Sequence, residues 1–366
     1  MVAGSGSFTV CIVNRDHKIV RMGVRYYEGE WKDTMTKTEL QPETIQKLGS
    51  AAYPAFAMIA GMQLDLFTPL GTRPMDALQL AGELGVEPAR LTPLLYALVA
   101  ADLLTVSEGR FANTPEADHF LVKGKPAYLG GRHAFYTARY KELQQTAMSI
   151  RTGHPQAKLD FAAMSPEAME TYLRGLHPGT KAVGHFLANR MDFSTCRHLL
   201  DVGGGSGGLA IAISAVCPQL HVTVLEMPSV APVTQRFIEE EGMAGRADVV
   251  TGNAVQGPLT GVYDVAVLRA FFQVLSVDEA RQALRNLFRV LKPGSPILIV
   301  GQVLDDSRLS PTATVAFNLV FINVYDEGRA YTEHEYRCWL AEAGFTRIER
   351  VILPGGESLI TAHKPV

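Results

Sequence analysis

The feature that most limits the fold of this chain is the alternation of apolar and amphipathic runs between residues 198 and 303. The apolar runs, which suit buried strands, occupy 198–202, 221–225, 247–251, 263–268 and 297–303. Helical periodicity fills the intervals 209–216, 230–240 and 278–291. Strands that lack polar alternation are covered on both faces, and strand–helix units set successive strands parallel. The sequence therefore predicts an α/β fold with a doubly wound, largely parallel sheet.

A mostly helical region precedes this alternation. Helical periodicity covers 45–67, 75–84 and 87–104, the last helix is entered through Pro88, and a short two-stranded hairpin follows at 106–111. Three helices and a small hairpin are typical of a winged helix. The third helix is too apolar along most of its length for a DNA-reading helix, since its apolar face carries Leu91, Leu94, Leu95, Leu98 and Val99. We expect this face to bury against a second copy of the chain, with ordinary core packing as the alternative.

These patterns predict four segments. Residues 1–40 form an N-terminal extension, in which β-branched runs at 8–14 and 18–27 predict a hairpin. Residues 41–130 form the winged-helix-like dimerisation domain, and residues 191–366 form the α/β domain. Residues 131–190 form a helical linker, with breaks predicted at 153–155 and 177–179, where Gly and Pro cluster.

Composition excludes several classes of partner. Thirty-four Lys and Arg against thirty-seven Asp and Glu give a formal charge of −3, and no block of like charge predicts a nucleic-acid surface. No apolar run has the length and flanks of a membrane-spanning segment. The four Cys are scattered without metal-ligand spacing, so we expect neither a metal site nor disulfides. The first residues lack the pattern of an export signal, and we expect a soluble, cytoplasmic protein.

A glycine loop joins the strand at 198–202 to the helix at 209–216. Gly203, Gly205 and Gly208 match the dinucleotide spacing G-x-G-x-x-G, which by itself is weak support for a nicotinamide cofactor. Asp201, two residues before the first glycine, suggests a cationic ligand instead. Glu226 ends the next strand, where its two oxygens can accept both hydroxyls of a ribose.

Four motifs together resemble the S-adenosylmethionine-dependent methyltransferases of the small-molecule O-methyltransferase family. They are Asp201 to Gly207, Glu226-Met227-Pro228, Gly252-Asn253-Ala254, and Arg289-Val290-Leu291-Lys292-Pro293-Gly294. The resemblance covers residues 42 to 363, including the helical N-terminal domain. It implies S-adenosylmethionine as cofactor, no metal, and a homodimer formed through the N-terminal domain.

The resemblance also implies roles for the cofactor-binding residues, to which Asp201 and Ala254 belong through their motifs. Gly203 and Gly205 would pass beside the methionyl part, Glu226 would hold the ribose, and Met227 would pack on the adenine. Asn253 stands where the family has an adenine-contacting Asp, with an ordinary turn Asn as the alternative. Arg269 matches a basic position near the cofactor carboxylate, with a solvated strand-end Arg as the alternative.

The family's general base is absent. Gln273 stands at the position of the family's His, in the segment Leu268-Arg269-Ala270-Phe271-Phe272-Gln273-Val274-Leu275. Gln takes up no proton at physiological pH, so it cannot act as a base. Gly301 and Ala330 fall where the family has carboxylates that orient the His. The base and its supports are therefore missing together.

Without a base, the acceptor needs a nucleophile with a free lone pair and no acidic proton, such as a thioether sulfur, a carboxylate or a tertiary amine. We therefore predict S-methylation of a thioether hydroxy acid. The resemblance points within the family to bacterial S-methylation of 4-methylthio-2-hydroxybutyrate in dimethylsulfoniopropionate synthesis. Gln273, His177 and Tyr140 are the candidate catalytic residues. A phenolic acceptor would need another base, for which His133, His177 and His185 are available.

One helix face suits a small carboxylate-bearing acceptor. It carries Arg132, Tyr136, Arg139 and Tyr140, at spacings i, i+4, i+7 and i+8. Two guanidiniums and two phenols can grip a carboxylate, although a helix surface packed on the other subunit is the alternative. Trp31 and Arg329, with Tyr325 and Tyr331, are candidates for a lid over the acceptor.

Four other functions stay open. One is O- or C-methylation of a phenolic, carotenoid or tetrapyrrole-like natural product with a different base. Another is a family member that binds the cofactor without transferring its methyl group. A winged-helix regulator and a nicotinamide-dependent dehydrogenase are the remaining alternatives.

Overall fold

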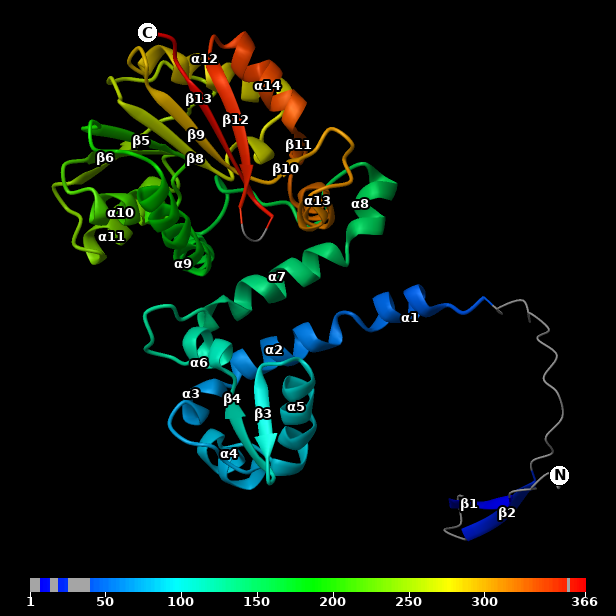
Figure 1. Cartoon of the computed structure of the whole chain (residues 1–366). Coiled ribbons are helices and arrows are strands. Elements are labelled where there is room, and N and C mark those ends of the chain that lie inside the picture. The colour runs from blue at the N-terminus through cyan, green and yellow to red at the C-terminus, as the bar shows by residue number, and fades with distance from the viewer. Residues whose placement is uncertain (1–6, 14–18, 26–39, 354–355) are drawn as a thin grey trace, which may run out of the picture. The chain divides into compact units, whose positions relative to one another are not determined.

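The structure is a computed structural model that describes residues 7–13, 19–25, 40–353 and 356–366 (Figure 1). The chain divides into two compact units, Met1–Ala52 and Tyr53–Val366. In the first unit, strands β1 (Ser7–Val13) and β2 (Ile19–Arg25) form the expected antiparallel hairpin, and helix α1 (Glu43–Ser50) follows. Trp31 lies outside the described residues, so its predicted place in a lid stays a prediction.

The second unit begins with helices and a small hairpin. These are α2 (Tyr53–Gln63), α3 (Phe67–Leu70), α4 (Ala77–Leu84), α5 (Pro88–Ala100), β3 (Leu104–Ser107), β4 (Arg110–Asn113) and α6 (Pro115–Leu121). A capping box between Asp76 and Gln79 opens α4, and Gly85 ends it in the left-handed conformation. The single helix predicted over 45–67 is wrong: it is divided at residues 51–52 and again at 64–66, where Asp65 has a φ of 52°.

The apolar face of α5 packs mainly inside its own unit. Leu91, Leu95 and Leu98 are buried in a cluster with residues of α2, α3, α4 and the β3–β4 hairpin. Leu94 and Val99 pack partly buried against the same cluster. The expectation that this face forms the surface between two subunits is therefore corrected. A helix of two turns with Leu at i, i+4 and i+7 can face an internal core as well as an interface between subunits, and the sequence pattern does not distinguish them.

Helices then lead to the α/β sheet. They are η1 (Gly130–Arg132), α7 (His133–Leu143), α8 (Thr146–Thr152) and α9 (Pro166–Arg190). The break at 153–155 is confirmed, because Gly153 ends α8 with a φ of 72°. The break predicted at 177–179 is wrong, because α9 runs unbroken through Pro178. Pro178 removes one helical hydrogen bond, but α9 packs closely along helix α10 (Gly208–Val216), where a Cβ on Gly184 would meet the Leu209 carbonyl oxygen at 2.6 Å.

The sheet has seven strands in the order β12-β13-β9-β8-β5-β6-β7. The parallel strands β5 (His198–Val202), β6 (His221–Glu226), β7 (Ala247–Thr251), β8 (Val265–Arg269) and β9 (Pro296–Gly301) match the five predicted apolar runs. Strand β13 (Ser358–His363) is antiparallel to β9, and β12 (Thr346–Ile352) is antiparallel to β13. Strand order reverses beside β5, and this reversal opens a crevice at the carboxyl ends of β5 and β8.

Helices cover both faces of the sheet (Figure 1). One core joins the sheet to α9, α10 and α11 (Ala231–Glu240). The other joins it to α12 (Val277–Val290) and α14 (Glu333–Glu342). The remaining elements are η2 (Phe272–Val274), β10 (Val303–Leu304), α13 (Thr312–Val324) and β11 (Tyr331–Thr332). The predicted fold class, a doubly wound sheet with an N-terminal helical region, is confirmed.

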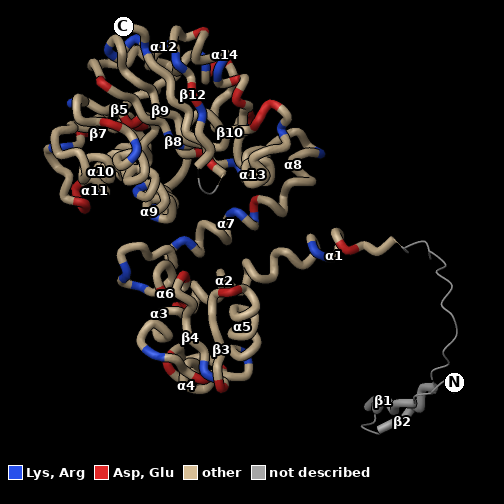
Figure 2. The backbone as a smooth tube through the Cα atoms, viewed as in Figure 1, with Lys and Arg blue, Asp and Glu red and all other residues tan. Residues whose placement is uncertain are grey.

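Charged residues of both signs are interspersed along the described chain (Figure 2). Within the described residues, no helix combines the length and apolarity needed to cross a membrane. The same residues contain no group of three or more His, Cys, Asp or Glu placed to hold a metal ion.

Candidate functional site

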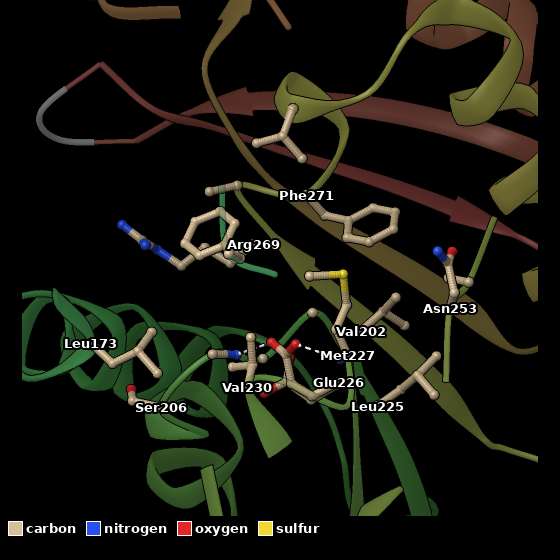
Figure 3. Close-up of a pocket in the computed structure, with 18 of the residues that line it drawn as sticks. Leu173, Val202, Ser206, Leu225, Glu226, Met227, Val230, Asn253, Arg269 and Phe271 are labelled. Carbon is tan, nitrogen blue, oxygen red and sulfur yellow. Dashed lines mark hydrogen bonds between the residues drawn. The ribbon is translucent and has the colours of Figure 1, made fainter. Parts of the chain in front are cut away.

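A cavity of about 420 Å³ opens where strands β5, β6 and β8 end (Figure 3). This is the crevice expected from the reversal of strand order. All eight residues predicted to bind the cofactor line it: Asp201, Gly203, Gly205, Glu226, Met227, Asn253, Ala254 and Arg269. The fold thus brings together side chains that lie as far apart as 68 positions in the sequence.

The glycine loop lets backbone approach the cavity. Gly203 and Gly205 have φ values of 65° and 59°, in the left-handed region that favours glycine. A Cβ on Gly204 would lie 2.6 Å from a methyl of Val224 and 2.7 Å from Oδ2 of Asp201. The loop therefore has no room for a side chain at this position.

Glu226 sits at the end of β6 and is buried. Its Oε1 accepts a hydrogen bond from the Gly205 N–H at 2.6 Å, and its Oε2 accepts one from the Met227 N–H at 2.9 Å (Figure 3). Burial raises the pKa of Glu226, although these two hydrogen bonds oppose the shift. Each carboxylate oxygen keeps further lone pairs that can accept from a vicinal diol.

Asp201 is the most strongly perturbed acid in the cavity. Burial, together with the nearby charge of Glu226, raises the pKa of Asp201 to about 7. Its Oδ2 is buried without a hydrogen-bond partner. A buried carboxylate oxygen without a partner is costly, so the site favours a ligand that brings a hydrogen-bond donor or a positive charge. The two buried carboxylates thus fit a cofactor with ribose hydroxyls and a positively charged sulfonium, as an adenosyl sulfonium has.

Asn253 and Arg269 both have local partners besides lining the cavity. Oδ1 of Asn253 accepts from the Val255 N–H at 2.8 Å, which is the turn geometry foreseen as the alternative role. Nη2 of Arg269 lies 3.1 Å from Oε1 of Glu357. The cation at this end of the cavity is thus already paired with an acid.

Gln273 does not line the cavity. It is buried in η2, where its Oε1 accepts a hydrogen bond from the Gln302 N–H at 3.2 Å. A Cβ on Gly301 would lie 2.5 Å from the same oxygen, so Gly301 leaves the space that Gln273 fills. The residues at the positions of the family's base and one of its supporting acids therefore pack against each other as a structural contact.

The three candidate replacement bases also stand outside the lining. His177 is buried on α9, with both ring nitrogens engaged by Ser206 and Glu241. His133 begins α7 and His185 lies on α9, and neither is part of the cavity wall. None of the described residues that line the cavity is a His. The geometry therefore supports no imidazole base, and for His177 it points to a different role.

The structure does not bring the predicted carboxylate clamp to the cavity wall. The Arg132 guanidinium lies over the rings of Phe135 and Tyr136, at 5.4 and 5.3 Å from their centroids. Arg139 pairs with Glu142 at 3.0 Å. The Tyr140 ring packs 4.9 Å from that of Phe56 on α2. These side chains therefore pack within their own chain, and the alternative of packing on the other subunit stays a prediction.

Arg329 also lies outside the cavity wall. Its guanidinium stacks 4.9 Å over the ring of Tyr331 and approaches Glu335 to 3.8 Å, and its side chain stays 48% exposed. Tyr325, by contrast, does line the cavity. Of the lid candidates in the described residues, only Tyr325 has the predicted position.

The sequence reasoning missed most of the wall that lies beyond the cofactor-binding residues. That wall is apolar and aromatic: Phe161, Met169, Tyr172, Leu173, Leu176 and Phe271. Four of these residues stand on α9 at positions 169, 172, 173 and 176. Their spacing is that of one helix face, and it is the signal in the sequence that could have located them.

Comparisons with known proteins agree with this geometry. The sequence profile of the O-methyltransferase domain matches residues 140–346, and that of the O-methyltransferase dimerisation domain matches residues 49–123. The tetracenomycin polyketide synthesis 8-O-methyl transferase of Streptomyces glaucescens is 28% identical over 330 residues, which cover 88% of this chain and 97% of that protein. An N,N-dimethyltransferase of Streptomyces rimosus is 27% identical over 347 residues, covering 90% and 100%.

A solved structure shares the same fold. Human N-acetylserotonin methyltransferase, in complex with S-adenosylmethionine, matches with a TM-score of 0.79 at 20% identity, over 91% of this chain and 100% of that chain.

Proposed function

The chain belongs to the O-methyltransferase family, and from this premise we propose that it methylates a small, mostly apolar acceptor through an atom that needs no imidazole base. It is an S-adenosylmethionine-dependent methyltransferase, and it dimerises through its N-terminal domain. One observation carries the proposal: no His stands among the described residues of the cavity wall, and the residue at the family's base position is a buried amide.

The chain's own residues would hold the cofactor from three sides. Glu226 would accept from the ribose hydroxyls, and Met227, Asn253 and Ala254 would enclose the adenine. Gly203 and Gly205 would bring their backbone beside the methionyl part. When bound, S-adenosylmethionine supplies an electrophilic methyl group, so an acceptor with a free lone pair needs only alignment and the exclusion of water.

The acceptor end of the cavity supplies that alignment through rings and aliphatic chains. Phe161 and Tyr172 pack edge to face with centroids 5.7 Å apart, and Phe271 and Tyr325 line the cavity with them. Burial raises the pKa of both Tyr172 and Tyr325. Both phenols therefore stay protonated near neutral pH, where they can donate hydrogen bonds but cannot remove a proton.

Two kinds of acceptor fit these constraints. A thioether hydroxy acid such as 4-methylthio-2-hydroxybutyrate demands least of the protein, because sulfur reacts without losing a proton. Its carboxylate would have to share Arg269 with Glu357, since Arg139 is paired with Glu142 outside the wall. A neutral aromatic amine, or a phenol that ionises readily, is favoured instead by the aromatic rings at this end of the cavity.

The deciding experiment is product analysis by mass spectrometry. Purified protein would receive methyl-labelled S-adenosylmethionine and, separately, thioether acids, aromatic amines and phenols of graded acidity. We expect label on the acceptors whose nucleophilic atom reacts without first losing a proton, with a rate at saturating cofactor that is nearly flat from about pH 6 to about pH 9. Methylation of weakly acidic phenols, with a single ionisation in the His range, would refute the proposal.

A further inference from the structure

A buried polar network links helix α9 to the glycine loop. Nδ1 of His177 lies 2.8 Å from Oγ of Ser206, and Nε2 lies 3.1 Å from Oε1 of Glu241. The other oxygen of Glu241 accepts a hydrogen bond from Nζ of Lys181 at 2.8 Å. Phe237 packs beside the imidazole, with ring centroids 4.8 Å apart. His177 is therefore held on both edges and on one face.

These partners decide which ring nitrogen carries the proton. Although burial alone would raise it, the contacts with Lys181 and His177 lower the pKa of Glu241, so this carboxylate is ionised and can only accept. Nε2 of His177 must then donate to it. Burial lowers the pKa of His177, so the imidazole is neutral near pH 7 and Nδ1 keeps a lone pair. The hydroxyl of Ser206 therefore donates its only hydrogen to Nδ1.

Ser206 also lines the cofactor cavity. Figure 3 places Ser206, Leu173 and Arg269 on the side of Glu226 opposite to Asn253. If Glu226 binds the ribose and Asn253 lies beside the adenine, the methionyl part extends toward Ser206. That part of the cofactor ends in an ammonium and a carboxylate group, and an ammonium has hydrogen-bond donors but no acceptor.

We propose that His177 is a positioning residue that fixes the Ser206 hydroxyl as a hydrogen-bond acceptor for the methionyl ammonium of S-adenosylmethionine. With its hydrogen committed to Nδ1, Oγ has only lone pairs left for another partner. The opposite orientation of the hydroxyl would set a donor against the ammonium. The network thus selects for the charged tail of the cofactor, whereas Glu226 and Asn253 address its adenosyl part.

Protonation of His177 would reverse this arrangement. Nδ1 would then donate to Ser206, and the hydroxyl hydrogen would turn away from α9. The charged groups that face His177 are Glu241 and Glu240 at the end of α11, and Arg174 and Lys181 on α9. Because burial lowers the pKa of His177, we expect binding of the ammonium to weaken only on the acid side of the ordinary imidazole range.

The test compares two ligands that differ only at the tail. S-adenosylhomocysteine carries the ammonium, whereas 5′-methylthioadenosine keeps the adenosyl thioether and lacks the amino acid. Their dissociation constants would be measured by calorimetry on the full-length protein at pH 7.5 and 5.5. No acceptor is needed, so the result does not depend on the proposed function. Asp201 and Glu226 titrate as well, but they act on the adenosyl part that both ligands share.

Three variants separate the network from a merely structural role. We expect Ser206→Ala to weaken the binding of S-adenosylhomocysteine about tenfold and to leave the binding of methylthioadenosine unchanged. His177→Gln should behave alike, because its amide reaches Glu241 and misses Ser206. His177→Asn should stay near the wild type, because its carbonyl oxygen takes the place of Nδ1 as acceptor.

Equal weakening of both ligands, or no weakening of either, would overturn the proposal. If the His177 variants do not fold, the pH dependence of ligand binding by the wild type and by Ser206→Ala still tests the proposal. The preference of the wild type for S-adenosylhomocysteine over methylthioadenosine must then fall from pH 7.5 to 5.5, and that of Ser206→Ala must not. A pH-independent preference in the wild type would contradict the role of His177.

Discussion

Replacing Asp201 by Asn is expected to stabilise the cofactor-free protein. Asp201 is fully buried beside Glu226, and burial with that charge raises its pKa from 3.8 to about 7. A pKa unit corresponds to about 1.4 kcal/mol, so ionising Asp201 in the folded state costs about 4 kcal/mol relative to the unfolded chain. The pKa of Asp201 is higher in the folded protein than in the unfolded chain. The wild type is therefore free of this cost below about pH 4, and it loses stability as the pH rises to about 7. Asn keeps the shape and removes the charge.

Urea unfolding followed by circular dichroism, at pH 8 and pH 5, measures this effect. We expect Asp201→Asn to exceed the wild type in free energy of unfolding by up to about 4 kcal/mol at pH 8 and by about 2 kcal/mol at pH 5. The same variant should bind S-adenosylhomocysteine more weakly, because the cavity loses a charged hydrogen-bond acceptor.

Asp264 offers a matched control of opposite sign. It accepts hydrogen bonds from the backbone N–H groups of Arg197 and His198, at 2.8 and 2.9 Å, and pairs with Lys292. Although burial opposes them, these contacts lower the pKa of Asp264. Asp264→Asn should therefore destabilise the protein at pH 8. If Asp201→Asn is no more stable than the wild type at pH 8, or keeps its full advantage at pH 5, the reasoning from burial is wrong.

Three further predictions concern the cavity. Gly204→Ala should weaken the binding of S-adenosylhomocysteine at least tenfold, measured by calorimetry, because the new Cβ would lie 2.6 Å from Val224 and displace the loop. Unchanged affinity would mean that the loop can accommodate the methyl group, and it would contradict this prediction. Gln273→His should confer no methylation of weakly acidic phenols in the product assay, because position 273 is buried against Gly301 without a carboxylate to orient an imidazole. Tyr172→Phe should raise KM for the acceptor about three- to tenfold and leave cofactor affinity unchanged, since one neutral hydrogen bond is lost at the acceptor end; a change in cofactor affinity alone would contradict this placement.

Local pattern was enough to predict the five parallel strands of the sheet and the cofactor side of the cavity, but not the antiparallel strands β12 and β13. The predicted ends of the parallel strands differ from the observed ends by at most a few residues. Strands buried on both faces consist of continuous apolar runs, which are easy to recognise in a sequence. Asp201, Glu226 and Arg269 follow from one rule, because ligands bind where parallel strands end beside a reversal of strand order. The local sequence alone predicts that a residue lies at the end of a strand, whatever its neighbours from distant parts of the chain.

Positions that depend on packing between distant segments were settled only by the tertiary structure. Pro178 looked like a helix break, but contact of α9 with α10 along Gly184 keeps the helix whole. Arg139 looked like a ligand for a carboxylate, yet its partner is Glu142, in the next turn of the same helix. The sequence likewise identified His177 as a residue of interest, but its role depends on Ser206 and Glu241, which lie 29 and 64 positions away. Periodicity determines which face a residue occupies, whereas only the packed fold decides what that face meets.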